Sequence, residues 1–268
     1  MSPMNQQSNY AFLQKYQRLQ LSVMFDDLID LEFATIGFSK TDPSSFWNLA
    51  LTDELLNEKQ LDEIETKLTS LNRKTTIYFE NRHDLANLVS LLVIRNYKKS
   101  FEDCWQFWDN GQIDTKHFES TKKVNTDKDL KIFIDTFNAC YRKDDPQNPY
   151  GELGEYLRVT EDAWHRHHAA NRLEYFLTYK GDRPVAVSTL TNYEDIGYIS
   201  NVGSLMEVRG EGFGKAATHY CVDRSIRNGH TEHCLATEEG HYPNEFYKRI
   251  GFSIRFTALG YTQTASTN

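Results

Sequence analysis

The sequence predicts an α/β protein, a mixed central sheet flanked by helices, and three observations support this prediction. Strand-like and helix-like patterns alternate along most of the 268 residues. Hydrophobic residues make up 39% of the chain and aromatic residues 13%, which is enough for a packed core. The strand-like segment "YISNVGSLMEV" runs into three alternate glycines and then into a helix-like segment.

The first part of the chain shows three helical and three extended patterns. Helices are expected over residues 9–20, 57–72 and 83–97, and the second of them carries Leu61, Ile64, Leu68 and Leu71 at helical spacing. Strands are expected over residues 46–51, 75–80 and 101–109.

The second part predicts more strands. A strand over 119–125 precedes a helix over 126–142, which Thr126 or Asp127 caps. A loop and a helix over 155–168 follow. Three strands then come over 173–179, 183–193 and 197–205, the first two joined by the turn "KGDR". The remaining expected elements are a helix ending at Asn228, a strand over 233–239, a short helix over 243–250 and extended structure over 252–262.

Glycine usage divides the chain into two domains. Only Gly37 and Gly111 lie in the first 125 residues, and the other twelve glycines follow. The polar segment 108–120 carries turn signals at Asn110 and Gly111, so we expect domains over 1–115 and 116–268. The order helix, strand, helix, strand occurs in both 57–108 and 212–261, which indicates a duplication. The first copy lacks the glycine cluster.

Composition argues against several functions. A net charge of −8 disfavours nonspecific nucleic-acid binding, and there is no apolar stretch or leader typical of membrane insertion or secretion. Four scattered cysteines without CxxC spacing favour a reducing cytoplasm and predict no metal. His165 and His168 lie three residues apart on an expected helix, a spacing at which both could bind one metal ion, although a solvated helix face is the simpler interpretation.

The segment "VRGEGFGKAA" predicts an anion site. The first backbone N–H groups of a helix have no intrahelical acceptor, and the helix dipole adds partial positive charge. Arg209 and Lys215 add formal charge beside the glycines. The P-loop pattern fails because Ala216 stands where Ser or Thr is required. The dinucleotide and kinase glycine patterns fail because Lys215 replaces their third glycine.

One family fits these residues. "RGEGFG" resembles the R/Q-x-x-G-x-G/A loop of the GCN5-related N-acetyltransferases (GNAT), and "NEFYKRIGF" resembles their Tyr-x-x-x-Gly-Phe signature. The resemblance covers residues 120–262, and the first half resembles the degenerate partner domain of tandem GNAT proteins. It implies the GNAT (acyl-CoA N-acyltransferase) fold in two tandem copies, the second being an acyltransferase of class EC 2.3.1.-.

The resemblance also implies how acetyl-CoA, the co-substrate, is bound. It lies between two splayed strands, with its diphosphate on the loop backbone and its pantetheine paired with the preceding strand. Asn244 either touches the cofactor or only caps its helix. The implied binding residues are Gly203, Ser204, Leu205, Arg209, Gly210, Gly212, Phe213, Gly214, Lys215 and Asn244.

The implied chemistry is direct attack of a primary amine on the thioester in a ternary complex. The amine must lose a proton, and a strand amide can polarise the thioester carbonyl. Tyr247 is expected to protonate the departing thiolate, unless it is only a packed aromatic. The base stays open among Glu194, Asp195, Glu238, Glu239, His241 and a water chain.

The acceptor is expected to be a small-molecule or peptide amine, and the sequence does not determine the oligomeric state. The alternative is a non-catalytic acetyl-CoA-binding sensor or interaction module. A purely structural α/β protein would leave the three glycines unexplained.

Overall fold

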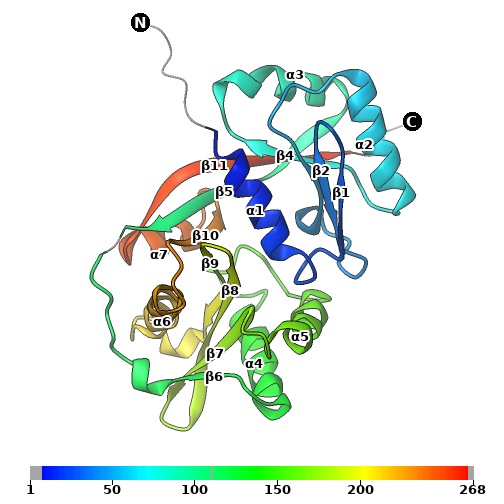
Figure 1. The fold of residues 1–268 in the computed structure, drawn as a ribbon. Helices are drawn as coiled ribbons and strands as arrows, with labels where there is room; N and C mark the ends of the chain where they lie inside the picture. The colour runs from blue at the N-terminus through cyan, green and yellow to red at the C-terminus, as the bar shows by residue number, and fades with distance from the viewer. Residues whose placement is uncertain (1–7, 110, 265–268) are drawn as a thin grey trace, which may run out of the picture. The chain divides into compact units, whose positions relative to one another are not determined.

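A computed structural model describes residues 8–109 and 111–264, so Asn110 of the expected boundary lies outside the described residues (Figure 1). The chain forms two compact units, Met1–Cys104 with Phe256–Asn268, and Trp105–Arg255. Helices and strands alternate in both units, so the α/β class is confirmed. In the described part of the chain, short 3-10 helices connect longer elements: η1 (Ser45–Trp47), η2 (His83–Leu85), η3 (Phe118–Ser120) and η4 (Met206–Val208).

The first unit begins with helix α1 and builds a mixed sheet. Its elements are α1 (Tyr10–Gln20), β1 (Asp27–Asp30), β2 (Thr35–Phe38), β3 (Asn48–Leu51), α2 (Glu58–Ser70), β4 (Thr76–Glu80), α3 (Ala86–Ile94) and the first part of β5 (Tyr97–Trp108). Strands β1, β2 and β3 are antiparallel neighbours, and β4 lies parallel to β3. The β1–β2 hairpin has no clear signal in the sequence, because each strand has only four residues and β1 begins and ends with aspartate.

The last strand of the chain completes the sheet of the first unit. Strand β11 (Phe252–Gln263) pairs antiparallel with β4 through Ala258–Thr262, and the strand order is β1-β2-β3-β4-β11-β5. Gly260 permits this packing, since a Cβ there would lie 2.3 Å from the ring of Phe101. The compact units thus divide the chain differently from the ranges 1–115 and 116–268, which remain a proposal about where each copy begins and ends.

The second unit contains the glycine cluster. Its elements are β6 (Thr121–Lys123), α4 (Asp127–Cys140), α5 (Tyr156–His167), β7 (Leu173–Lys180), β8 (Arg183–Tyr193), β9 (Ile196–Ser204), α6 (Phe213–Arg227), β10 (Glu232–Glu238) and α7 (Tyr242–Arg249). The strand order is β5-β10-β9-β8-β7-β6. Strands β6 to β9 are antiparallel neighbours, whereas β10 lies parallel to β9.

Helices cover both faces of this second sheet (Figure 1). Tyr175 and Phe176 are neighbours on β7 and therefore point to opposite faces. The Tyr175 ring stacks on Phe133 of α4 at 4.4 Å, and its hydroxyl donates to the Thr160 carbonyl of α5. Phe176 packs against Tyr220 of α6 instead. Helices α4 and α5 thus lie on one face and α6 on the other.

The two units share one order of pairing. In each unit, three antiparallel strands are followed by a helix, by a strand parallel to the third strand and by a second helix. These elements are β1-β2-β3-α2-β4-α3 in the first unit and β7-β8-β9-α6-β10-α7 in the second. The duplication remains a proposal, and this correspondence supports it.

The buried His219 makes the stability of the second unit depend on pH. Its Nδ1 accepts the Asp114 N–H at 2.9 Å, so its Nε2 carries the proton and donates to the Ile250 carbonyl at 2.8 Å. Burial lowers the pKa of His219 below its usual 6.5. The unfolded chain therefore binds a proton that the folded chain does not. The free energy of unfolding should fall as pH drops below about 6.5, by up to about 1.4 kcal/mol per pH unit.

Urea unfolding between pH 7.5 and 5.5 measures this dependence. Its slope against pH should decrease in His219→Gln and stay unchanged in His241→Gln, because the His241 side chain is exposed. An equal slope in the parent and His219→Gln would contradict the assignment.

Candidate active site

Strands β9 and β10 separate along their length. They pair over only three residues of each strand, from Glu232 opposite Ile196 to Cys234 opposite Tyr198, and both strands then continue unpaired with one another. On its other edge β9 contains a bulge against β8, where Asn201 has a φ of 52°. A bulge increases the twist of its strand, which accounts for the separation. The gap expected between the two splayed strands is present.

The glycine cluster forms the start of α6. Gly210 and Gly212 have φ values of 81° and 95°, in the left-handed region that favours glycine. Gly212 is the N-cap residue, and its carbonyl accepts the first intrahelical bond from the N–H of Ala216 at 2.9 Å. The N–H groups of residues 213–215 have no acceptor within the helix. These N–H groups are therefore able to donate to a bound anion.

Two other glycines differ in whether the packing around them requires glycine. A Cβ at Gly214 would lie 3.6 Å from Phe246 and Ser204, which is ordinary contact, so packing does not require glycine there. A Cβ at Gly203 would lie 2.7 Å from the Cβ of Cys140. Gly203 is therefore needed for the end of α4 to pack against β9, whatever the strand binds.

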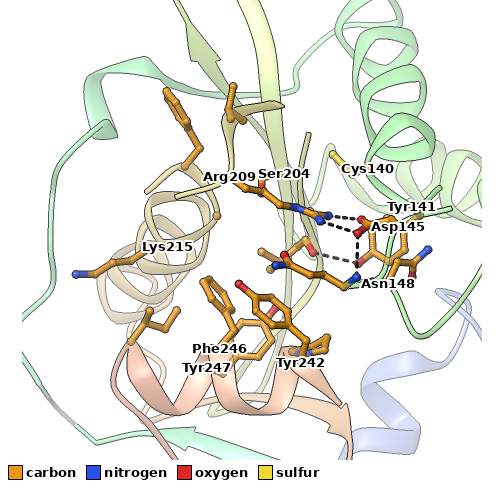
Figure 2. Close-up of a pocket in the computed structure, with 18 of the residues that line it drawn as sticks. Cys140, Tyr141, Asp145, Asn148, Ser204, Arg209, Lys215, Tyr242, Phe246 and Tyr247 are labelled. Carbon is orange, nitrogen blue, oxygen red and sulfur yellow. Dashed lines mark hydrogen bonds and ion pairs between the residues drawn. The ribbon is translucent and has the colours of Figure 1, made fainter. Parts of the chain in front are cut away.

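A cavity of about 360 Å3 lies at this loop (Figure 2). Its wall comes from the end of β9, the start of α6, one face of α7 and the loop between α4 and α5. The predicted residues that line it are Gly203, Ser204, Arg209, Gly210, Gly212, Phe213, Gly214, Lys215 and Tyr247. Leu205 is not among the lining residues, and its N–H donates to the Val185 carbonyl, continuing the sheet towards β8.

Both cations named from the sequence have carboxylate partners. The Arg209 guanidinium donates to both carboxylate oxygens of Asp145, with Nη1 to Oδ1 at 2.6 Å (Figure 2). The Asp145 carboxylate is fully buried, and this pairing lowers its pKa and raises that of Arg209. Lys215 points away from Arg209, and its Nζ lies 2.9 Å from Asp114. Asp145 could not be predicted from the sequence, because no motif marks an aspartate 64 residues away from Arg209.

Tyr247 lines the cavity from α7. Its ring makes edge contacts with Phe246 and Phe252 and is largely buried. Burial raises the pKa of Tyr247 well above its usual value of 10. The hydroxyl therefore stays protonated at neutral pH and is able to donate a proton or a hydrogen bond.

Asn244 is placed differently from both predicted roles. The N-cap of α7 is His241, and Asn244 does not line the cavity. Its buried side chain donates to the Thr237 hydroxyl of β10 at 3.3 Å, and its carbonyl accepts from Gln106 of β5. Asn244 holds α7 against these strands.

The candidate bases lie at opposite ends of the sheet. Glu194 occupies the β8–β9 turn at the start of β9, whereas the glycine loop follows the end of β9, roughly 30 Å along the nine-residue strand. The structure therefore does not bring Glu194 or Asp195 to the cavity. Glu238 ends β10, at the same edge of the parallel pair as the loop, and its Oε1 lies 3.8 Å from His241 Nε2.

No metal site is evident in the described residues, where no three His, Cys, Asp or Glu side chains gather suitably for an ion. The His168 ring stacks on Trp164 at 3.7 Å, and the exposed His165 lies 3.8 Å from Asp127. Across residues 8–109 and 111–264, the helices are too short or too polar to cross a bilayer.

The splayed strands, the glycine loop and the tyrosine on α7 form the arrangement that the resemblance to GNAT proteins predicts, and comparison with known families agrees. The sequence model of the family described as "Acetyltransferase (GNAT) domain" matches residues 115–249, about half of the chain. The chain belongs to this GNAT acetyltransferase family, whose members use acetyl-CoA. No curated protein matches the sequence.

Several solved structures share the fold. A GCN5-related N-acetyltransferase from Kribbella flavida is 15% identical, with a TM-score of 0.67 over 95% of both chains. A functionally unknown conserved protein from Staphylococcus epidermidis ATCC 12228 is 13% identical, with a TM-score of 0.62 over 88% of this chain and 92% of that one. A tandem GNAT protein from the clavulanic acid biosynthesis pathway is 10% identical, with a TM-score of 0.55 over 88% and 79%. These similarities confirm the GNAT fold.

Proposed function

We propose that the protein transfers the acetyl group of acetyl-CoA to a primary amine of a small molecule or peptide, by direct attack in a ternary complex. The observation that supports this most strongly is the cavity itself. It joins the N–H groups of α6 that have no acceptor within the helix, the end of β9 that is not paired with β10 and the protonated hydroxyl of Tyr247.

The residues present fit acetyl-CoA. A Cβ at Gly210 or Gly212 would meet nothing within 4 Å, so space remains at the loop for the diphosphate. Backbone N–H groups of Gly212 to Lys215 would hold it. The unpaired edge of β9 near Ser204 would pair with the pantetheine amides, as an added strand would.

The reaction balances with groups at this edge of the sheet. The amine nitrogen attacks the thioester carbon, the C–S bond breaks, and the proton of Tyr247 passes to the thiolate. The neutral amine loses one proton, which we assign to Glu238, to His241 or to a water held by them, and this proton then returns through solvent to the Tyr247 phenolate, so that both groups are restored. Glu194 is given no role, since it lies at the far end of β9.

Tyr247→Phe tests the donor. The variant keeps the buried ring and removes only the hydroxyl, so kcat should fall about 100-fold while acetyl-CoA affinity changes less than about twofold. Release of CoA thiol with a panel of amines measures kcat, and titration calorimetry measures affinity. Tyr220→Phe is the matched control, because Tyr220 is a partly buried tyrosine of the same unit that does not line the cavity.

An unchanged kcat in Tyr247→Phe would reject the donor role. Cofactor binding by the parent without thiol release from any amine would instead favour the non-catalytic sensor.

We further propose that the first unit is a degenerate GNAT-like domain. The connection from β3 to α2, residues 52–57, contains no glycine, whereas the corresponding connection from β9 to α6 contains Gly210 and Gly212. The first copy therefore lacks a phosphate loop. We also propose a reducing cytoplasm as the compartment, because Cys104, Cys140, Cys221 and Cys234 are buried and none of these described cysteines is part of a disulfide.

A further inference from the structure

Three cationic side chains line the cavity, and they are not equally available to a ligand. Arg209 is held by the buried Asp145, and Lys215 is paired with Asp114. Moving Arg209 to a ligand would leave a buried carboxylate without its partner, which is strongly destabilising. Arg209 is therefore better explained as the anchor that fixes the α4–α5 loop as a wall of the cavity.

Arg249 is the third cation, and it lies on the cavity face of α7. Lining residues Tyr242, Phe246, Arg249 and Ile250 follow helical spacing. Phe246 lies 3.6 Å from where a Gly214 Cβ would be, so this face reaches the first turn of α6. Glu245 and Lys248 do not line the cavity, and they pair with each other at 2.7 Å.

Within residues 8–109 and 111–264, no carboxylate pairs with the Arg249 guanidinium. Its central carbon lies 5.6 Å from the Tyr242 ring centroid, a cation–π contact that keeps the side chain on the cavity face. Among the ion pairs of the described residues, none involves Arg249. An arginine stacked on an aromatic ring keeps its N–H groups free to donate to a phosphate.

We propose that Arg249, and not Arg209 or Lys215, is the cation that binds the diphosphate of CoA. This inference rests on the proposed function. The backbone N–H groups of α6 would hold the diphosphate on one side, and the α7 guanidinium would neutralise it from the other. Arg249 is thus an additional cofactor-binding residue that the glycine motif does not include.

Calorimetric titration of the full chain with CoA and with 3′-dephospho-CoA tests this. Arg249→Gln should weaken both ligands about tenfold, the effect expected for one charge-assisted contact. Lys248→Gln is the matched control: it removes the same charge from the neighbouring residue, outside the cavity, and should change affinity less than about twofold. Thermal unfolding of the free protein should be alike in both variants.

Each other outcome is decisive. A parent protein that binds neither ligand would overturn the proposed function itself. A parent that binds, with equal affinities in the two variants, would overturn only the role of Arg249. A loss of affinity for CoA but not for 3′-dephospho-CoA would show that Arg249 binds the 3′-phosphate, and it would reject the diphosphate assignment. A loss accompanied by a lower unfolding temperature in Arg249→Gln alone would indicate a structural role.

Discussion

Gly214→Val is expected to weaken acetyl-CoA binding at least about 100-fold, or about 3 kcal/mol. A side chain at Gly214 would project between Ser204 and Phe246, both of which line the cavity. The branched methyl groups would occupy the space in which, under the proposed function, the cofactor meets the first N–H groups of α6. The measurement is a calorimetric or equilibrium titration with acetyl-CoA.

The matched control is Gly214→Ala. Its single methyl group makes only ordinary contacts at 3.6 Å, and the family loop accepts glycine or alanine here, so affinity should change less than about threefold. Position 214 is a cleaner test than Gly212, where a φ of 95° would add backbone strain to any substitution. Parent-like affinity in Gly214→Val would refute the loop as the diphosphate site.

Glu174→Gln is expected to cost the second unit about 3 kcal/mol of unfolding free energy at pH 7. The Glu174 carboxylate of β7 is fully buried and accepts from Lys123 at 2.9 Å and from Arg224 Nε at 3.0 Å. Asn228 and Asn192 also donate to it. A neutral amide would leave two cations without their counter-charge. The side chains of Lys123 and Arg224 remain partly exposed to water. The expected loss of unfolding free energy therefore lies at the low end of the range for breaking a buried ion-pair network.

The effect should depend on pH. Burial alone would raise the pKa of Glu174, but hydrogen bonds from Arg224, Lys123 and Asn228 outweigh it, and the pKa lies below its usual 4.5. The stabilisation is therefore present above about pH 4.5 and is lost as pH falls through the lower folded value. Urea unfolding should show parent and variant converging at acidic pH.

Glu245→Gln serves as the control for this charge change. Glu245 is exposed and pairs with Lys248 on the surface of α7, so its removal should cost less than about 1 kcal/mol. Similar losses in Glu174→Gln and Glu245→Gln would show that the buried network does not stabilise the unit.

Local sequence was sufficient for the elements and for the loop. Helical spacing predicted α2, and three alternate glycines predicted the start of α6, which lines the cavity. Such features depend on neighbours within a few residues, through backbone conformation and periodicity. The family and its fold followed from them and are confirmed.

Contacts between distant residues were decided by the tertiary structure alone. The sequence placed Arg209 and Lys215 at the phosphate, but folding brings Asp145 and Asp114 to them. It left Glu194 and Glu238 equal as bases, but the direction of β9 puts Glu194 at the far end of the sheet. The end of β11 pairs with β4, which lies far away in the sequence, and no local pattern indicates this pairing. Motif spacing reports the local backbone, whereas the partners of a charged side chain depend on long-range packing.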